Sequence, residues 1–73
     1  PQRDARAAAA ALDAGISAYK RERYDVAERA LVEATKNNPA DPVAWYFLGA
    51  ARWNRGTEEQ ARMDFAQGGA RER

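Results

Sequence analysis

The chain has 73 residues, with twelve basic and eleven acidic side chains, no cysteine and no histidine. A length near this allows one small domain with a thin core, because a chain of about 60 residues buries only about 60% of the surface that its unfolded form exposes. Without Cys or His the chain lacks the common transition-metal ligands and nucleophile–base pairs, so we expect no metal, no cofactor and no enzymatic activity.

The net charge of +1 is spread along the chain, with the two signs interleaved rather than gathered in blocks. This pattern is typical of a solvated surface and lacks the basic patch that follows a nucleic-acid backbone. No apolar run approaches the roughly 18 residues of a membrane span, and residues 1–15 lack the layout of a signal peptide. We therefore expect no nucleic-acid partner and no membrane insertion, and the cytoplasm is slightly favoured.

Two helices are predicted in the first half of the chain, near residues 4–21 and 24–37. No β-branched alternating run occurs anywhere in the chain, which argues against strands. The second helix should end near Asn37, because Pro39 disfavours the helical conformation for Asn38 before it.

A third helix is predicted near residues 42–55. Asp41 can cap its first free N–H groups, and Pro42 is tolerated at the first helical position because its missing N–H had no partner there. Gly56 fits the residue that follows the end of this helix.

The fourth helix is predicted near residues 58–69. Thr57 is its expected cap, with Gln60 three residues later as the reciprocal partner of a capping box. The pair Gly68-Gly69 costs about 1 kcal/mol per glycine inside a helix, so we expect the end of the chain to fray from Gln67.

Helices joined by such short turns pack antiparallel, which predicts two helical hairpins. An offset of 34 residues aligns Gly15 with Gly49 at points where two helices must approach closely. Self-similarity at this period indicates stacked repeats. Further aligned pairs are Ala14 with Leu48, Tyr19 with Trp53, Arg21 with Arg55, Ala27 with Ala61 and Leu31 with Phe65.

These residues resemble the tetratricopeptide repeat (TPR) family. The second unit carries Trp45-x-x-Leu48-Gly49 and Ala61-x-x-x-Phe65; the first carries Gly15, YDVAERAL at 24–31, Ala34 and Asn38-Pro39. The resemblance covers residues 8–41 and 42–73 of a single domain, after an N-terminal extension of residues 1–7. It implies an all-α fold of two stacked antiparallel helix-turn-helix hairpins, a fragment of an α-solenoid superhelix.

The chain departs from the family pattern at several places. Ala11 and Ala14 stand where bulkier residues are usual, so the first helix should pack thinly. Glu22 replaces the usual turn glycine, Arg52 stands where an aromatic is common, and the last unit lacks its closing proline.

By resemblance, the inner, concave face should hold a peptide or a partner protein, which implies a scaffold or adaptor role. The candidate positions are Leu12, Asp13, Ile16, Tyr19 and Lys20 in the first unit, and Val43, Tyr46, Phe47, Ala50, Trp53 and Asn54 in the second. For Ile16, Tyr46 and Phe47 the alternative is that they only fill the core between the repeats. Tyr19 and Trp53 would suit anchoring, since Trp and Tyr dominate interface energetics.

The consecutive residues 45–48 should serve two sides of one helix. We expect Trp45 and Leu48 to face the hairpin core, and Tyr46 and Phe47 to face the adjoining repeat and the concave face. Phe65 is expected to be buried in the second hairpin.

Some TPR domains clamp the C-terminal carboxylate of a partner with Asn and Lys or Arg. Here the matching places hold Ile16 and Phe47, and Lys20 is one cation without a converging second. Since a carboxylate leaves water only when charge-assisted donors replace its hydration, we expect an apolar or aromatic segment instead.

Two other kinds of function are weighed against this one. RNA binding through pentatricopeptide-like repeats would need a period one residue longer and a more basic chain. Self-association is the other. Two repeats are fewer than the roughly three that such arrays need, so we expect either that the chain is part of a longer array in a larger protein, or that its exposed end packs on another copy as a homodimer. The carboxylates, among them Glu28, are predicted to lie on solvated faces interleaved with arginine.

Overall fold

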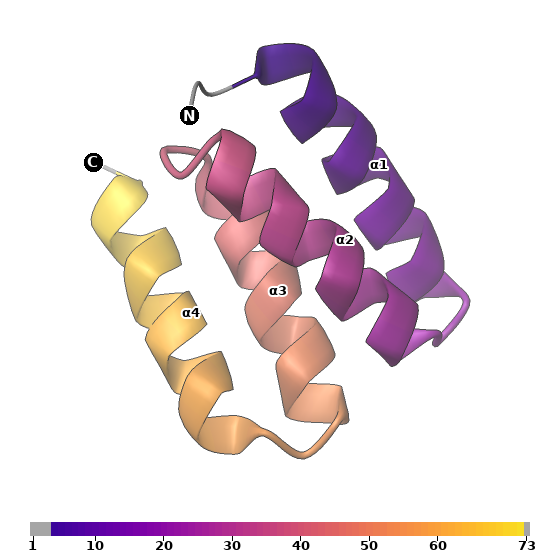
Figure 1. Ribbon diagram of the computed structural model, residues 1–73. Helices are drawn as coiled ribbons and strands as arrows, with labels where there is room; N and C mark the ends of the chain where they lie inside the picture. Colours follow the sequence, from indigo (N-terminus) through magenta and orange to yellow (C-terminus); the bar gives the residue numbers. More distant parts are fainter. Residues whose placement is uncertain (1–3, 73) are drawn as a thin grey trace.

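The computed structural model describes residues 4–72, which form four α-helices and no strand (Figure 1). The helices are α1 (Ala5–Lys20), α2 (Tyr24–Asn37), α3 (Pro42–Asn54) and α4 (Glu58–Arg71). Each bound lies within two residues of the one predicted from the sequence, and the predicted all-α fold is confirmed. Residues 1–3 of the predicted extension and residue 73 of the predicted second unit lie outside the described residues.

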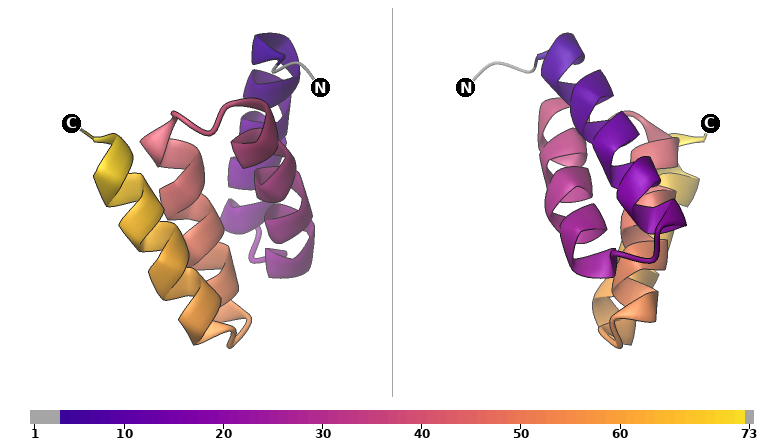
Figure 2. Two further views of the ribbon diagram at one scale, coloured as in Figure 1. Left: turned by 60° about the vertical axis from the view of Figure 1, so that its left-hand side comes forward. Right: turned by 90° about the vertical axis from the view of Figure 1, so that its right-hand side faces the viewer.

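The helices form two hairpins that pack side by side. α1 packs along α2 and α3 packs along α4, while α2 against α3 joins the two hairpins (Figure 1). α1 approaches α3 only lightly, and within residues 4–72 it does not approach α4. Figure 1 shows α2 and α3 between α1 and α4, and the left view of Figure 2 shows α4 beside α3 on the side away from α2. α3 is therefore covered on more sides than any other helix.

The two hairpins repeat each other at an offset of 34 residues. A Cβ atom placed on Gly15 would lie 2.5 Å from Leu31 Cγ, and one placed on Gly49 would lie 2.6 Å from Phe65 Cε1. Both separations are shorter than a carbon–carbon contact allows. Each glycine thus lets its helix approach the equivalent residue of its partner helix, and the predicted register is confirmed.

The turns inside the two hairpins also match at this offset. Arg23 N donates to Ala18 O at 2.9 Å, and Thr57 N donates to Arg52 O at 3.0 Å. Glu22 has φ 60° in the first turn and Gly56 has φ 89° in the second. The turn therefore requires a residue with the left-handed backbone conformation, and in the first hairpin this residue is a glutamate.

The start of α3 follows the prediction, while that of α4 differs in one respect. Asp41 Oδ1 accepts a hydrogen bond from Val43 N at 3.0 Å, and Pro42 stands at the start of α3. Thr57 precedes α4, but its Oγ1 donates to Arg52 O at 3.0 Å and caps nothing in α4. The predicted capping box with Gln60 is wrong, because the hydroxyl is used to close the preceding turn.

The end of α4 is longer than predicted, since the helix continues through Gly68-Gly69 to Arg71. A Cβ atom on Gly68 would lie 2.6 Å from the ring of Tyr46, so this glycine lets the ring pack on the helix. Arg71 Nε donates to Pro39 O at 2.7 Å, and the Arg71 guanidinium lies 5.5 Å from the centre of the Trp45 ring. These contacts hold the segment that was expected to fray.

The core is made mostly of small residues. Its buried cluster consists of Ala18, Ala27, Leu31, Leu48 and Ala51. Leu31 and Leu48 are the largest fully buried side chains. Trp45 and Phe47 pack against this cluster while staying partly exposed. A thin core of this kind agrees with the expectation from chain length.

Candidate functional site

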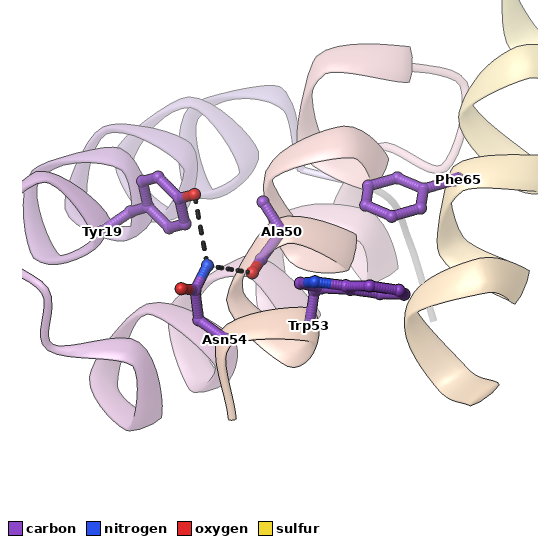
Figure 3. Close-up of a pocket in the computed structure, with 5 residues that line it drawn as sticks. All are labelled: Tyr19, Ala50, Trp53, Asn54 and Phe65. Atoms are coloured by element: carbon purple, nitrogen blue, oxygen red, sulfur yellow. Dashed lines mark hydrogen bonds between the residues drawn. The ribbon is translucent and has the colours of Figure 1, made fainter. Parts of the chain in front are cut away.

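Two adjoining hollows lie along α3, between α1 and α4. The first has a volume of about 340 Å³ and the second about 220 Å³. Tyr19 and Ala50 line both, so the two form one continuous surface (Figure 3 shows the first). We call it the aromatic groove; its residues are Tyr19, Tyr46, Phe47, Ala50, Trp53, Asn54 and Phe65.

Tyr19 brings the α1 side of the groove into contact with α3. Its ring meets Phe47 edge-on, with ring centres 5.6 Å apart, and meets Tyr24 at 5.4 Å. Asn54 Nδ2 donates to Ala50 O at 2.8 Å and to Tyr19 Oη at 3.4 Å (Figure 3). The tyrosine ring is therefore held in place from two sides.

Trp53 of α3 and Phe65 of α4 form the side of the groove that is nearest α4 (Figure 3). Trp53 is 45% exposed and Phe65 is 37% exposed. The expectation that Phe65 is buried is wrong. Its equivalent Leu31 is 0% exposed, because α2 is covered by both α1 and α3, whereas within residues 4–72 α4 packs only on α3.

A cluster of charged side chains links three helices outside the groove. Arg52 Nε donates to Glu28 Oε2 at 3.0 Å, and Arg52 Nη1 donates to both oxygens of Asp64 at 3.1 Å. Arg55 Nη1 donates to Glu28 Oε1 at 2.5 Å. Glu28 was predicted to be solvated, but its side chain is only 18% exposed. Arg55 and Arg52 both hydrogen-bond this carboxylate, and Arg52 stands where an aromatic is common in the family pattern.

The pKa values of the two carboxylates in this cluster are shifted in opposite directions. Burial raises the pKa of Glu28, but hydrogen bonds from Arg55 and Arg52 outweigh it, so that the pKa ends below its usual value. Burial raises the pKa of Asp64 above its usual value, and the Arg52 charge offsets only part of this effect. The Asp64 carboxylate is therefore the less well stabilised of the two.

Within residues 4–72, no group of acidic side chains is arranged to hold a metal ion. None of the four described helices combines the length and the apolar character that crossing a membrane requires.

The family model of the tetratricopeptide repeat matches residues 12–73, which is most of the chain. The chain belongs to the tetratricopeptide repeat family. No curated protein and no solved structure matches it significantly. TPR units form a non-enzymatic repeat module and generally mediate protein–protein interactions.

Six of the candidate positions of this TPR domain meet in the aromatic groove; they are Tyr19, Tyr46, Phe47, Ala50, Trp53 and Asn54. Leu12 lines a separate cavity of about 140 Å³ together with Ala8 and Ala34. Asp13, Lys20 and Val43 are exposed, Ile16 is half-buried, and none of the four lines the groove.

Tyr46 and Phe47, the two aromatic residues in the middle of the TPR motif, pack against different helices. Phe47 meets Tyr19 of the adjoining hairpin, as predicted. Tyr46 instead lays its ring on Gly68 within its own hairpin, and its hydroxyl donates to Glu72 at 2.6 Å. This hydrogen bond raises the pKa of Tyr46. Tyr46 thus packs on α4 and also lines the groove.

Phe65 is the groove residue that sequence reasoning missed. Its alignment with Leu31 suggested the same burial, although Leu31 lies in a helix followed by another hairpin. Sequence reasoning had no signal for the difference, because it depends on which helices pack together: within residues 4–72 α2 packs on both α1 and α3, whereas α4 packs on α3.

Proposed function

We propose that the aromatic groove binds an apolar or aromatic segment of a protein partner in helical form, with Trp53 and Tyr19 as its anchors. The observation that carries this proposal is that rings from α1, α3 and α4 meet on one surface whose lining residues are all uncharged. Exposed aromatic surface gathered in this way is typical of interaction sites. A helix is the expected form of the segment, because its apolar side chains recur about one turn apart and the groove consists of two adjoining hollows.

The same lining argues against a carboxylate-binding TPR groove. The amide of Asn54 is its one side-chain amide donor, and it is already engaged with Ala50 O and Tyr19 Oη. A carboxylate placed here would lose its hydration without gaining charged donors. An apolar side chain has no such hydration to lose, and each of the two hollows offers it three aromatic rings.

The proposal is tested by selecting helical peptides from a displayed library on the domain and measuring their affinity by calorimetry. We expect the selected peptides to carry aromatic or large aliphatic residues about one turn apart. Trp53→Ala should weaken their binding about 30-fold, the equivalent of about 2 kcal/mol. The matched control is Val26→Ala, because Val26 is also an exposed apolar residue but lies on α2 outside the groove.

Acidic peptides that end in a free carboxylate, of the EEVD type, should give no heat of binding. Micromolar binding of such a peptide, abolished by amidating its C-terminus, would overturn the proposal. So would selected peptides whose affinity is the same for the wild type and for Trp53→Ala.

A further inference from the structure

The two tryptophans of the chain differ in what their indole N–H groups bond. Trp45 Nε1 donates to Pro39 O at 2.8 Å, inside the fold. Trp53 Nε1 belongs to the aromatic groove, and within residues 4–72 it donates to no acceptor. Since Trp53 is 45% exposed, water can bond this N–H in the free domain.

The hydroxyl of Tyr19 is a second donor of the groove that lacks an acceptor. Its oxygen accepts from Asn54 Nδ2 at 3.4 Å, but among the described residues no group accepts its hydrogen. Tyr19 and Trp53 line the same hollow of about 340 Å³. In Figure 3 the Tyr19 hydroxyl and the Trp53 nitrogen each lie at the end of the ring that is nearer Ala50. The hollow therefore presents two uncharged donors among its rings.

A bound segment changes the surroundings of both donors. Apolar side chains that fill the hollow displace the water around Trp53 Nε1 and Tyr19 Oη. A donor buried without a hydrogen-bond partner weakens binding about fivefold or more. The segment that binds best therefore brings an acceptor of its own among its apolar residues.

The acceptor that suits these donors is the side-chain carboxamide of a glutamine. The main-chain carbonyl groups inside a helix are already bonded within that helix. Ser and Thr hydroxyls bond to the main chain of their own helix, and a carboxylate would lose its hydration without gaining charged donors. A carboxamide oxygen is uncharged and has two lone pairs, so it can accept from two donors at once.

We infer that the helix bound in the aromatic groove carries a glutamine whose side-chain oxygen accepts hydrogen bonds from Trp53 Nε1 and Tyr19 Oη. This inference rests on the proposed function and adds to it the chemistry by which the groove selects its partner. The rings of Trp53 and Tyr19 contact the apolar side chains of the helix, and their polar atoms specify the glutamine.

The inference is tested with peptides selected from the displayed library, in which we expect glutamine to recur at one position. Three versions of one such peptide carry glutamine, methionine or glutamate at this position, away from the ends of the helix. Methionine has nearly the shape of glutamine without its acceptor. Calorimetry should show that the glutamine peptide binds about fivefold or more tightly than each of the other two.

Two variants of the domain remove one donor each and keep an aromatic ring. Trp53→Phe and Tyr19→Phe should each weaken binding of the glutamine peptide about fivefold. Both should weaken binding of the methionine peptide less, because that peptide offers the lost donor no acceptor. The difference between the two peptides thus separates the hydrogen bonds from the contacts of the rings.

The indole N–H signals in NMR spectra give a direct measurement with an internal control. The glutamine peptide should move the Trp53 indole proton downfield, because the proton enters a hydrogen bond to the carboxamide. The methionine peptide should not. The Trp45 indole proton should stay in place with either peptide, since Trp45 Nε1 already donates to Pro39 O.

Failure of this inference is distinguishable from failure of the proposed function. If Trp53→Ala weakens binding but the glutamine and methionine peptides bind equally, the inference is overturned and the proposed function stands. The same holds if Trp53→Phe weakens both peptides alike, or if the glutamate peptide binds most tightly. A library that yields no binder, or peptides whose affinity Trp53→Ala leaves unchanged, would overturn both.

Discussion

Gly15 and Gly49 occupy equivalent places but face neighbours that differ in freedom. The neighbour of Gly15 is Leu31, whose branching carbon is close to the backbone and whose side chain is fully buried. The neighbour of Gly49 is the ring of Phe65, which is partly exposed and can turn outward. The same added methyl group therefore has different consequences at the two sites.

We expect Gly15→Ala to destabilise the domain by about 1–3 kcal/mol through overpacking. Gly49→Ala should change stability by less than about 1 kcal/mol, because the ring can move and alanine is favoured over glycine in a helix. Urea unfolding of both variants, followed by circular dichroism, gives the two free energies. Equal losses would mean that the Phe65 ring is as firmly held as Leu31.

At the scale of elements, the two hairpin turns place different residues at one backbone conformation. Glu22 and Gly56 both have positive φ, and the space around a Cβ on Gly56 is empty within 4 Å. The cost of a side chain there is thus a property of the backbone alone. A non-glycine residue in the left-handed region costs about 1–2 kcal/mol.

Glu22→Gly should therefore stabilise the domain by about 0.5–1 kcal/mol, after allowing for the greater flexibility of glycine in the unfolded chain. Gly56→Ala is the matched reverse change and should destabilise it by about 1 kcal/mol. Thermal and urea unfolding of the two variants measure both changes in stability. A loss of stability in Glu22→Gly would show that the glutamate side chain makes a contribution larger than its backbone cost.

At the scale of the whole molecule, the charged cluster around Arg52 connects α2, α3 and α4. Because the folded-state pKa of Glu28 is lowered, its ionisation stabilises the fold above its usual pKa of 4.5 and this stability is lost as the pH falls. The folded-state pKa of Asp64 is raised, so its ionisation costs stability. That cost is absent below its usual pKa of 3.8 and grows as the pH rises through the raised value.

Replacing Glu28 or Asp64 by its neutral amide should therefore change the free energy of unfolding in opposite directions. We expect Glu28→Gln to lower the free energy of unfolding at neutral pH, with a difference from the wild type that closes as the pH falls below about 4.5. Asp64→Asn should leave stability unchanged or slightly raised at neutral pH, again with a difference that closes in acid. Unfolding free energies measured across this pH range would contradict the assignment if both variants lost stability equally.

The sequence by itself determined where the helices lie and how the hairpins repeat. Signals such as Asp41-Pro42 and Gly56 act within one turn of the chain, so neighbouring residues suffice to interpret them. The glycines at 15 and 49 predicted the register, because close approach leaves no room for another side chain. Only the tertiary structure decided which side chains remain exposed to solvent and which are paired. The exposure of Phe65 and the pairing of Arg52 depend on whether another helix packs there, and no residue nearby in the chain carries that information.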